Sequence, residues 1–275
     1  MNLLPHEEYV EQAYFFRTLR ERLQEDGSTQ DHLQLISQEL LATTQLPMAI
    51  QFLVTELKFS GGFAPAMKRL PHYFTSFQTY LIEEAENDAG QFDFLVALEI
   101  LERDAEYRGG TPTVQGAFFY QFEAISRNRL KYDHGLTAMS GDPIYDEAWS
   151  EWLIILRGQI GLVDFADMVF VRSENYEKKP GEENIQVLFG EREGKIAGAN
   201  HRKDPIHLFN ALQRHLHYPE VPRHKRADDA ESLLPLLMSK VEQLEAKVSL
   251  LEEELQGGIN LSKFYVREKG GASEA

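Results

Sequence analysis

Apolar residues recur at steps of three and four residues from residue 1 to about 158, which is the spacing of helices with one buried stripe. The first such segment runs from His6 to Asp26 and carries Val10, Ala13, Phe16, Leu19 and Leu23 on its stripe. Thr111-Pro112 and Asp142-Pro143 are helix-start signals, because each places proline directly after a capping residue. The pattern predicts about seven helices in an array or bundle, without the signature of a helical repeat.

The pattern changes after Gly161. Three short runs of strand-forming residues follow, at residues 168–171, 185–189 and, more weakly, 195–199. Gly190 and Gly194 bracket a charged link between the last two runs, as in a hairpin connection. We therefore predict a small antiparallel β-hairpin or three-stranded sheet, which must pack on helices because it is too small to be stable alone. Asp204-Pro205 then begins another helix.

The most regular pattern lies near the C-terminus, where seven apolar residues alternate at spacings of three and four: Leu234, Leu237, Val241, Leu244, Val248, Leu251 and Leu255. This is the a/d seam of a heptad repeat, and valine at a with leucine at d favours a parallel two-stranded coiled coil. It predicts a homodimer, or pairing with another coiled-coil protein. Because the seam spans only about three heptads, docking of one amphipathic helix on its own domain is the alternative.

These patterns divide the chain into four parts. Residues 1–158 form a helical domain, and residues 159–226 form a module of β-hairpin plus helix. Residues 232–256 form the coiled-coil helix, and residues 257–275 form a partly disordered tail. The predicted fold class is mainly α, with a multi-helix N-terminal array, the small inserted sheet and a C-terminal coiled coil.

Composition narrows the functional classes. The chain has 275 residues, 43% of them hydrophobic, which is enough for a sizeable core. It has no cysteine, which excludes disulfides, thiolate nucleophiles, iron–sulfur clusters and cysteine zinc sites. We see neither a signal peptide nor an apolar run long enough to span a membrane. We therefore expect a cytoplasmic protein.

The net charge of −16 disfavours nonspecific binding to nucleic acid or anionic lipid. Residues 201–226 differ, because they hold six Lys or Arg and five of the nine His against two acidic residues, a net charge of +4. Pairing of these cations with acidic surface elsewhere is the favoured interpretation. An anion site is the alternative, and it would form if this segment met the basic end of the helix that begins at Thr111. Its candidates are Arg127, Arg129, Arg172, Arg202, Lys203, His207 and Arg214.

No metal or cofactor site is predicted. The histidines of residues 201–226 lack the usual ligand spacings. The segment 190–196 has one residue too few between its glycines for a phosphate-binding loop. Glu99, Glu102 and Glu106 share a helix face, but no Glu-x-x-His motif accompanies them, so we expect a solvated acidic face.

Three functional hypotheses follow. The leading one is a non-enzymatic cytoplasmic scaffold or protein-interaction protein that self-associates through its coiled coil. The alternative is a module that binds phosphate or nucleic acid through residues 201–226, the only segment where nucleic-acid binding is expected. The weaker alternative is an enzyme without a recognisable motif, and no catalytic residue is assigned.

Overall fold

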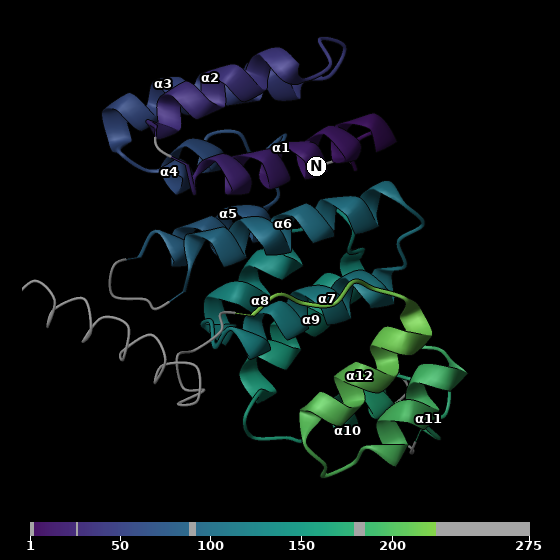
Figure 1. Cartoon of the computed structure of the whole chain (residues 1–275). Helices are drawn as coiled ribbons and strands as arrows, with labels where there is room; N and C mark the ends of the chain where they lie inside the picture. The colour runs from purple at the N-terminus through teal and green to yellow at the C-terminus, as the bar shows by residue number, and fades with distance from the viewer. Residues whose placement is uncertain (1–2, 26, 88–91, 179–184, 224–275) are drawn as a thin grey trace, which may run out of the picture. The chain divides into compact units, whose positions relative to one another are not determined.

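A computed structural model describes residues 3–25, 27–87, 92–178 and 185–223. Over these residues the chain forms twelve helices and no β-sheet (Figure 1). The helices are α1 (His6–Arg22), α2 (Thr29–Glu39), α3 (Leu46–Ser60), α4 (Phe63–Lys68), α5 (Ser76–Ala85), α6 (Phe94–Gly109), α7 (Val114–Arg127), α8 (Tyr132–Ser140), α9 (Glu147–Gln159), α10 (Phe165–Val171), α11 (Glu191–Ala199) and α12 (Pro205–Leu216). The mainly α fold class is confirmed.

The helices pack in successive layers (Figure 1). Helix α1 lies between the α2–α3 pair and α6, and its contact with α6 is the most extensive between any two described helices. Helices α5 and α6 continue the stack towards α7, α8 and α9, and α10 to α12 form the last group. A largely aromatic core fills the space between α7, α9 and α10. There Phe118 contacts Trp149 and Trp152, and Phe122 stacks on Phe165. Both tryptophans are therefore part of the core.

Short polar side chains set many helix starts. Seven helices begin after a Ser, Thr or Asp that accepts a hydrogen bond from an amide of the first turn: Ser28, Thr75, Asp93, Thr113, Asp146, Asp164 and Asp204. Each cap of this kind stabilises its helix by about 1 kcal/mol. The predicted start at Asp204-Pro205 is confirmed. The starts expected at Thr111 and Asp142 lie two and four residues further along, at Thr113 and Asp146.

The predicted β-hairpin is wrong. Residues 168–171 belong to α10 and residues 195–199 belong to α11, while residues 185–189 form one isolated bridge, between Ser173 and Phe189. Phe165, Met168 and Val169 are buried together on one side of α10, so burial favours a helix over the strand propensity of a short apolar run. Gly194 allows α11 to approach residues 173–175, since a Cβ there would lie 2.2 Å from the Ser173 hydroxyl.

The acidic face predicted on α6 is solvated only in part: Glu106 is exposed, but Glu99 and Glu102 face α1. Glu102 is 7% exposed and accepts hydrogen bonds from Arg17 and Arg20 of α1, at 2.6 and 2.8 Å. Glu99 also pairs with Arg20, at 3.0 Å. The carboxylates therefore join α6 to α1.

The predicted coiled coil and tail lie outside the described residues, so the heptad seam stays a prediction, as do the domain boundaries. None of the described helices combines the length and apolar character needed to cross a membrane.

Candidate binding groove and basic surface

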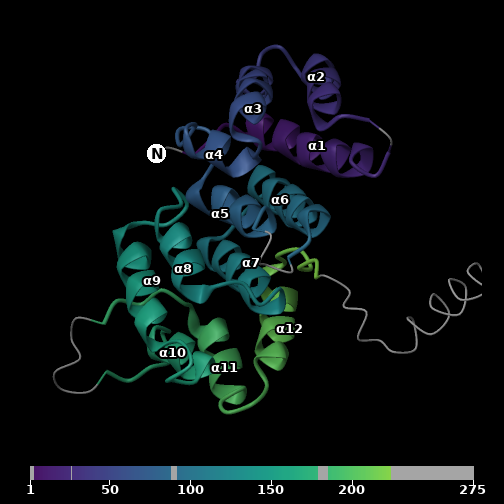
Figure 2. The same ribbon diagram turned by 90° about the vertical axis from the view of Figure 1, so that its left-hand side faces the viewer.

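An open groove of about 850 Å3 runs along α5. Figure 2 shows the three helices that line it, with α5 between α4 and α8. Its floor is a stripe at helical spacing, formed by Ser76, Thr79, Tyr80, Glu83, Glu84 and Asn87. One wall comes from α4 and the residues after it, and the opposite wall comes from α8 and its flanks. The remaining residues that line the groove are Met67, Lys68, Pro71, Phe74, Lys131, His134, Thr137, Ala138 and Gly141.

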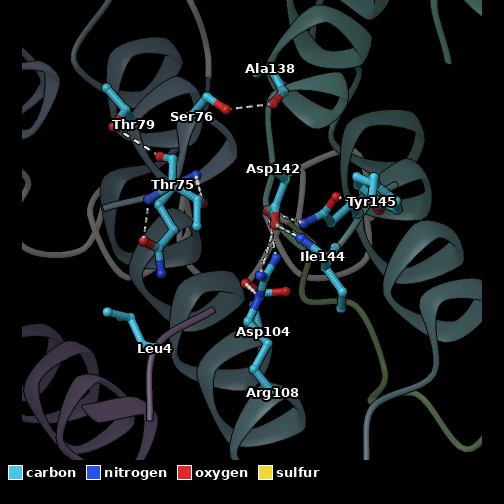
Figure 3. Close-up of polar contacts among 12 residues, drawn as sticks. Leu4, Thr75, Ser76, Thr79, Asp104, Arg108, Ala138, Asp142, Ile144 and Tyr145 are labelled. Atoms are coloured by element: carbon cyan, nitrogen blue, oxygen red, sulfur yellow. Dashed lines mark hydrogen bonds and ion pairs between the residues drawn. The ribbon is translucent and has the colours of Figure 1, made fainter. Parts of the chain in front are cut away.

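Hydrogen bonds fix the wall formed by α8. The Ser76 hydroxyl at the start of α5 donates to the carbonyl of Ala138, at 2.7 Å (Figure 3). The Tyr80 hydroxyl donates to the carbonyl of Lys131, at 2.9 Å. Burial raises the pKa of Tyr80, so this phenol keeps its proton and acts as a hydrogen-bond donor. The two bonds hold both ends of α8 against α5.

A carboxylate fixes the wall formed by α4. Glu86, directly after α5, accepts hydrogen bonds from the first amides of α4, those of Phe63 and Ala64. These amides have no partner within the helix, and a negative charge is favourable at a helix N-terminus. Glu86 thereby ties the start of α4 to the end of α5.

The groove combines apolar side chains with charges at one end. Met67 and Phe74 on its wall and edge and Tyr80 on its floor are apolar and almost completely buried. At the charged end Lys68 pairs with Glu83 at 2.6 Å, and Lys131, on the other wall, pairs with Glu84 at 3.3 Å. Both lysine side chains are about half exposed, and such pairs contribute at most about 1 kcal/mol. A charged ligand can therefore replace one partner of either pair at a small cost in free energy.

The groove is suited to binding. His134 is the only imidazole among the described residues that line it, and the Ser76 hydroxyl is committed to a backbone carbonyl. No nucleophile and base in hydrogen-bond contact face this groove among those residues. Its volume is that of a ligand cleft or of a site for several side chains of a docked helix.

A separate group of charges is fully buried between α6, α7 and the turn before α9 (Figure 3). Arg108 donates to Asp104 at 2.7 Å and forms two bonds with Asp142, at 3.0 and 2.6 Å. Gln121 donates to Asp142 at 3.1 Å and accepts from the hydroxyl of Tyr145 at 2.7 Å. This cluster joins three segments and is closed to solvent, so its role is structural. The sequence did not reveal this cluster, because Asp142-Pro143 has the pattern of a helix start.

Asp104 is the weakly satisfied member of this cluster. Its Oδ1 atom is buried and has no hydrogen-bond partner among the described residues. Two carboxylates share one guanidinium, and burial raises the pKa of Asp104 more than Arg108 lowers it.

The two basic segments of the sequence meet at the end of α7. The Arg127 guanidinium donates to the side chain of Asn210 on α12, at 3.4 Å, and Asn128 donates to the carbonyl of Pro222, at 3.0 Å. Arg127 also pairs with the buried carboxylate of Glu123. Arg129 follows directly and is exposed. This is the contact on which the anion-site alternative depended.

The remaining predicted anion-site residues divide into two groups. His207 and Arg214 are exposed on the side of α12 opposite its buried residues, and Arg202 and Lys203 are exposed in the turn before it. The first free amide of α12, that of Ile206, is occupied by Asp204 at 2.9 Å. Arg172 lies at the end of α10 against the carbonyl of Gln186, where burial lowers its pKa. No contact joins Arg172 to the other cations within the described part of the chain.

The histidines of residues 201–223 serve different contacts. His215 pairs with Glu193 of α11 at 2.8 Å, and His201 pairs with Asp167. Asp164, Asp167 and His201 bring potential ligand atoms within 4.8 Å of one another. Asp164 caps α10 and accepts from the amide of Arg202 at 2.6 Å, so protein contacts account for this cluster. It was not among the sequence candidates.

Comparison of the chain with protein-family models, with curated proteins and with solved structures found no match. Within the described residues, the two surfaces that could bind a partner are the groove over α5 and the basic surface at α12 and the end of α7.

Proposed function

We propose that this protein is a non-enzymatic interaction scaffold whose groove over α5 binds an amphipathic helix of a partner protein. The groove carries the proposal. Three helices already supply its floor and two walls, so one more helix would complete a four-helix packing unit. An amphipathic helix in an apolar groove is a common mode of peptide recognition.

The charges at the groove's end match such a partner. Lys68 and Lys131 lie on opposite walls, and Glu83 and Glu84 lie between them on the floor. A helix with apolar residues along one face and both signs of charge at one end would exchange salt bridges with these four side chains while burying its apolar face over Phe74. Register would come from the charges and affinity from the apolar contact.

The heptad seam of residues 234–255 supports the scaffold role from the sequence alone. A parallel dimer through this seam would place two grooves in one particle. Two linked grooves bind a partner with two target helices more tightly than either groove alone, because the second contact becomes intramolecular.

A selection experiment tests the groove. A phage library of helical peptides would be selected on the full-length protein, and the peptides obtained would be measured against Ala138→Trp, which places an indole in the groove. We expect affinities in the micromolar range and a loss of about tenfold or more with Ala138→Trp, equivalent to about 1.4 kcal/mol. Thr55→Trp, on the exposed side of α3, is the matched control and should leave affinity unchanged.

Thermal melting of both variants would show that the fold is intact. If the selected peptides bind Ala138→Trp as well as they bind the unaltered protein, the groove is not the recognition surface and the proposal is wrong.

A further inference from the structure

A second surface has a charge opposite to that of the whole molecule. This surface, called the basic face, comprises His207, Asn210 and Arg214 on α12, Lys203 just before that helix, and Arg127 and Arg129 at the end of α7. The α12 residues lie opposite Leu208, Phe209 and Leu212, which are buried, so their side chains are on the outer side of the helix. Arg127 joins the two helices through Asn210.

Three cations of the basic face differ in their pairing from the arginines that join α1 and α6. On α1 and α6, Arg17, Arg20 and Arg103 all form ion pairs with glutamates. On the basic face, Lys203, Arg214 and Arg129 form no ion pair with any other residue in the described ranges. The expected pairing of this segment with the protein's own acidic surface is therefore limited, within those ranges, to His201 and His215.

We infer that the basic face binds an acidic segment of a partner protein. An unpaired cation gains Coulomb energy from an incoming carboxylate without first losing an internal partner. At physiological salt the screening length is about 8 Å, so the local charge of the face counts more than the distant acidic body.

The same observations disfavour nucleic acid as the occupant. A long polyanion would extend beyond the face and meet a protein whose net charge is −16. The basic face also includes no Phe, Tyr or Trp ring, and His207 alone offers little surface on which bases could stack. A short acidic segment, with its charge confined to the length of the face, avoids both problems.

The spacing of the cations suits a helical acidic segment. His207 and Arg214 are seven positions apart on α12, which is roughly 10 Å along the helix axis, and Lys203 lies just before the helix. An acidic helix with a carboxylate at every fourth residue repeats its charges every ~6 Å, so two or three carboxylates would face this length. This surface is separate from the groove, and its test is independent of the proposed groove function.

The test uses a fluorescein-labelled alanine-based peptide of about 16 residues with a glutamate at every fourth position, and fluorescence anisotropy on the full-length protein. We expect saturable binding at about 50 mM NaCl that weakens about tenfold or more at about 300 mM NaCl. The double variant Lys203→Gln/Arg214→Gln should bind the peptide at least about fivefold more weakly than the unaltered protein.

Three controls make the result specific. The double variant Lys58→Gln/Lys178→Gln removes the same charge from exposed positions outside the basic face, and should change affinity less than about twofold. A peptide with glutamine in place of glutamate should not bind. A thymidine oligonucleotide of similar length should bind more weakly than the acidic peptide.

The inference is overturned if the acidic peptide fails to bind at low salt, or if both double variants lose affinity equally. It is also overturned if the oligonucleotide binds more tightly than the peptide, because the face would then be a nucleic-acid surface. Ala138→Trp should leave peptide binding unchanged, so failure here is distinguishable from failure of the groove proposal.

Discussion

Replacement of Asp104 by asparagine tests the physical account of the buried charge cluster. Asp104 and Asp142 share Arg108 in a fully buried site, so full ionisation leaves one uncompensated negative charge. Asparagine has nearly the same shape, removes that charge, and its side-chain carbonyl still accepts from Arg108. We therefore expect Asp104→Asn to change the free energy of unfolding at neutral pH by less than about 1 kcal/mol, or to stabilise the protein.

The matched variant is Asp142→Asn. It replaces the carboxylate that receives both terminal nitrogens of Arg108 and the amide of Gln121. Asparagine there would turn an NH2 group towards one of these donors, and each buried donor left without an acceptor costs about 1–3 kcal/mol. The two substitutions are chemically identical and lie in one cluster, so their difference isolates how each carboxylate is compensated.

The pH dependence of stability is a further test of how burial affects Asp104. Burial raises the pKa of Asp104 above its unfolded value of about 3.9, so the folded state binds more protons between these two pKa values. The contribution of Asp104 to stability is thus fully present below the unfolded pKa and is lost as pH rises through the folded pKa. Asparagine lacks this loss, so the stability of Asp104→Asn relative to the unaltered protein should rise by up to ~1.4 kcal/mol per pH unit in this window.

Urea unfolding followed by the fluorescence of Trp149 and Trp152, both buried, measures these differences. The m-value should be the same for all variants, which shows that the unfolded state is comparable. A stability difference that stays flat with pH, or a cost for Asp104→Asn as large as that for Asp142→Asn, would refute the reasoning.

Two further predictions concern packing and assembly. Gly194→Ala should lower the free energy of unfolding by about 1–3 kcal/mol, because its Cβ would lie 2.2 Å from the Ser173 hydroxyl. Gly158→Ala, in α9 with open space around it, should raise the free energy of unfolding by up to about 1 kcal/mol. Thermal melting of both variants measures the two changes. Light scattering should give twice the chain mass for the full-length protein and the single-chain mass for Leu244→Glu/Leu251→Glu, because charges at d positions disrupt the seam; a mass that is the same for both would exclude the dimer.

The helical class was predictable because long apolar periodicity decides it. The first stripe, beginning near His6, corresponds to α1, and capping chemistry placed the start of α12 correctly. The error at residues 168–171 has a definite cause. A run of four apolar residues fits a strand or a buried helix equally well, and Asp164, which caps α10, was not recognised as a start signal.

The candidate sites were less predictable because they depend on contacts between distant segments. The acidic stripe of α5 indicates a solvated face until α4 and α8 are placed on either side of it. The basic face was predictable only in part. The sequence indicated Arg127 and residues 201–226 as basic, but it did not show the contact between Arg127 and Asn210 that joins the two segments. Arg172, which was also a candidate, lies elsewhere, against the carbonyl of Gln186. Asp104 and Arg108 are four residues apart, a spacing typical of surface ion pairs, so their burial was not evident.

The placement of α1 against α6 has a consequence for synthesis on the ribosome. Helix α1 ends at Arg22 and α6 begins at Phe94, so at about 5–20 residues per second the nascent chain carries α1 for about 4–14 s before its main neighbour exists. The side of α1 that later meets α6 includes Arg17 and Arg20. These guanidiniums keep that side hydrated while it is uncovered, and Glu99 and Glu102 then receive them, so the interface that forms late also resists premature association.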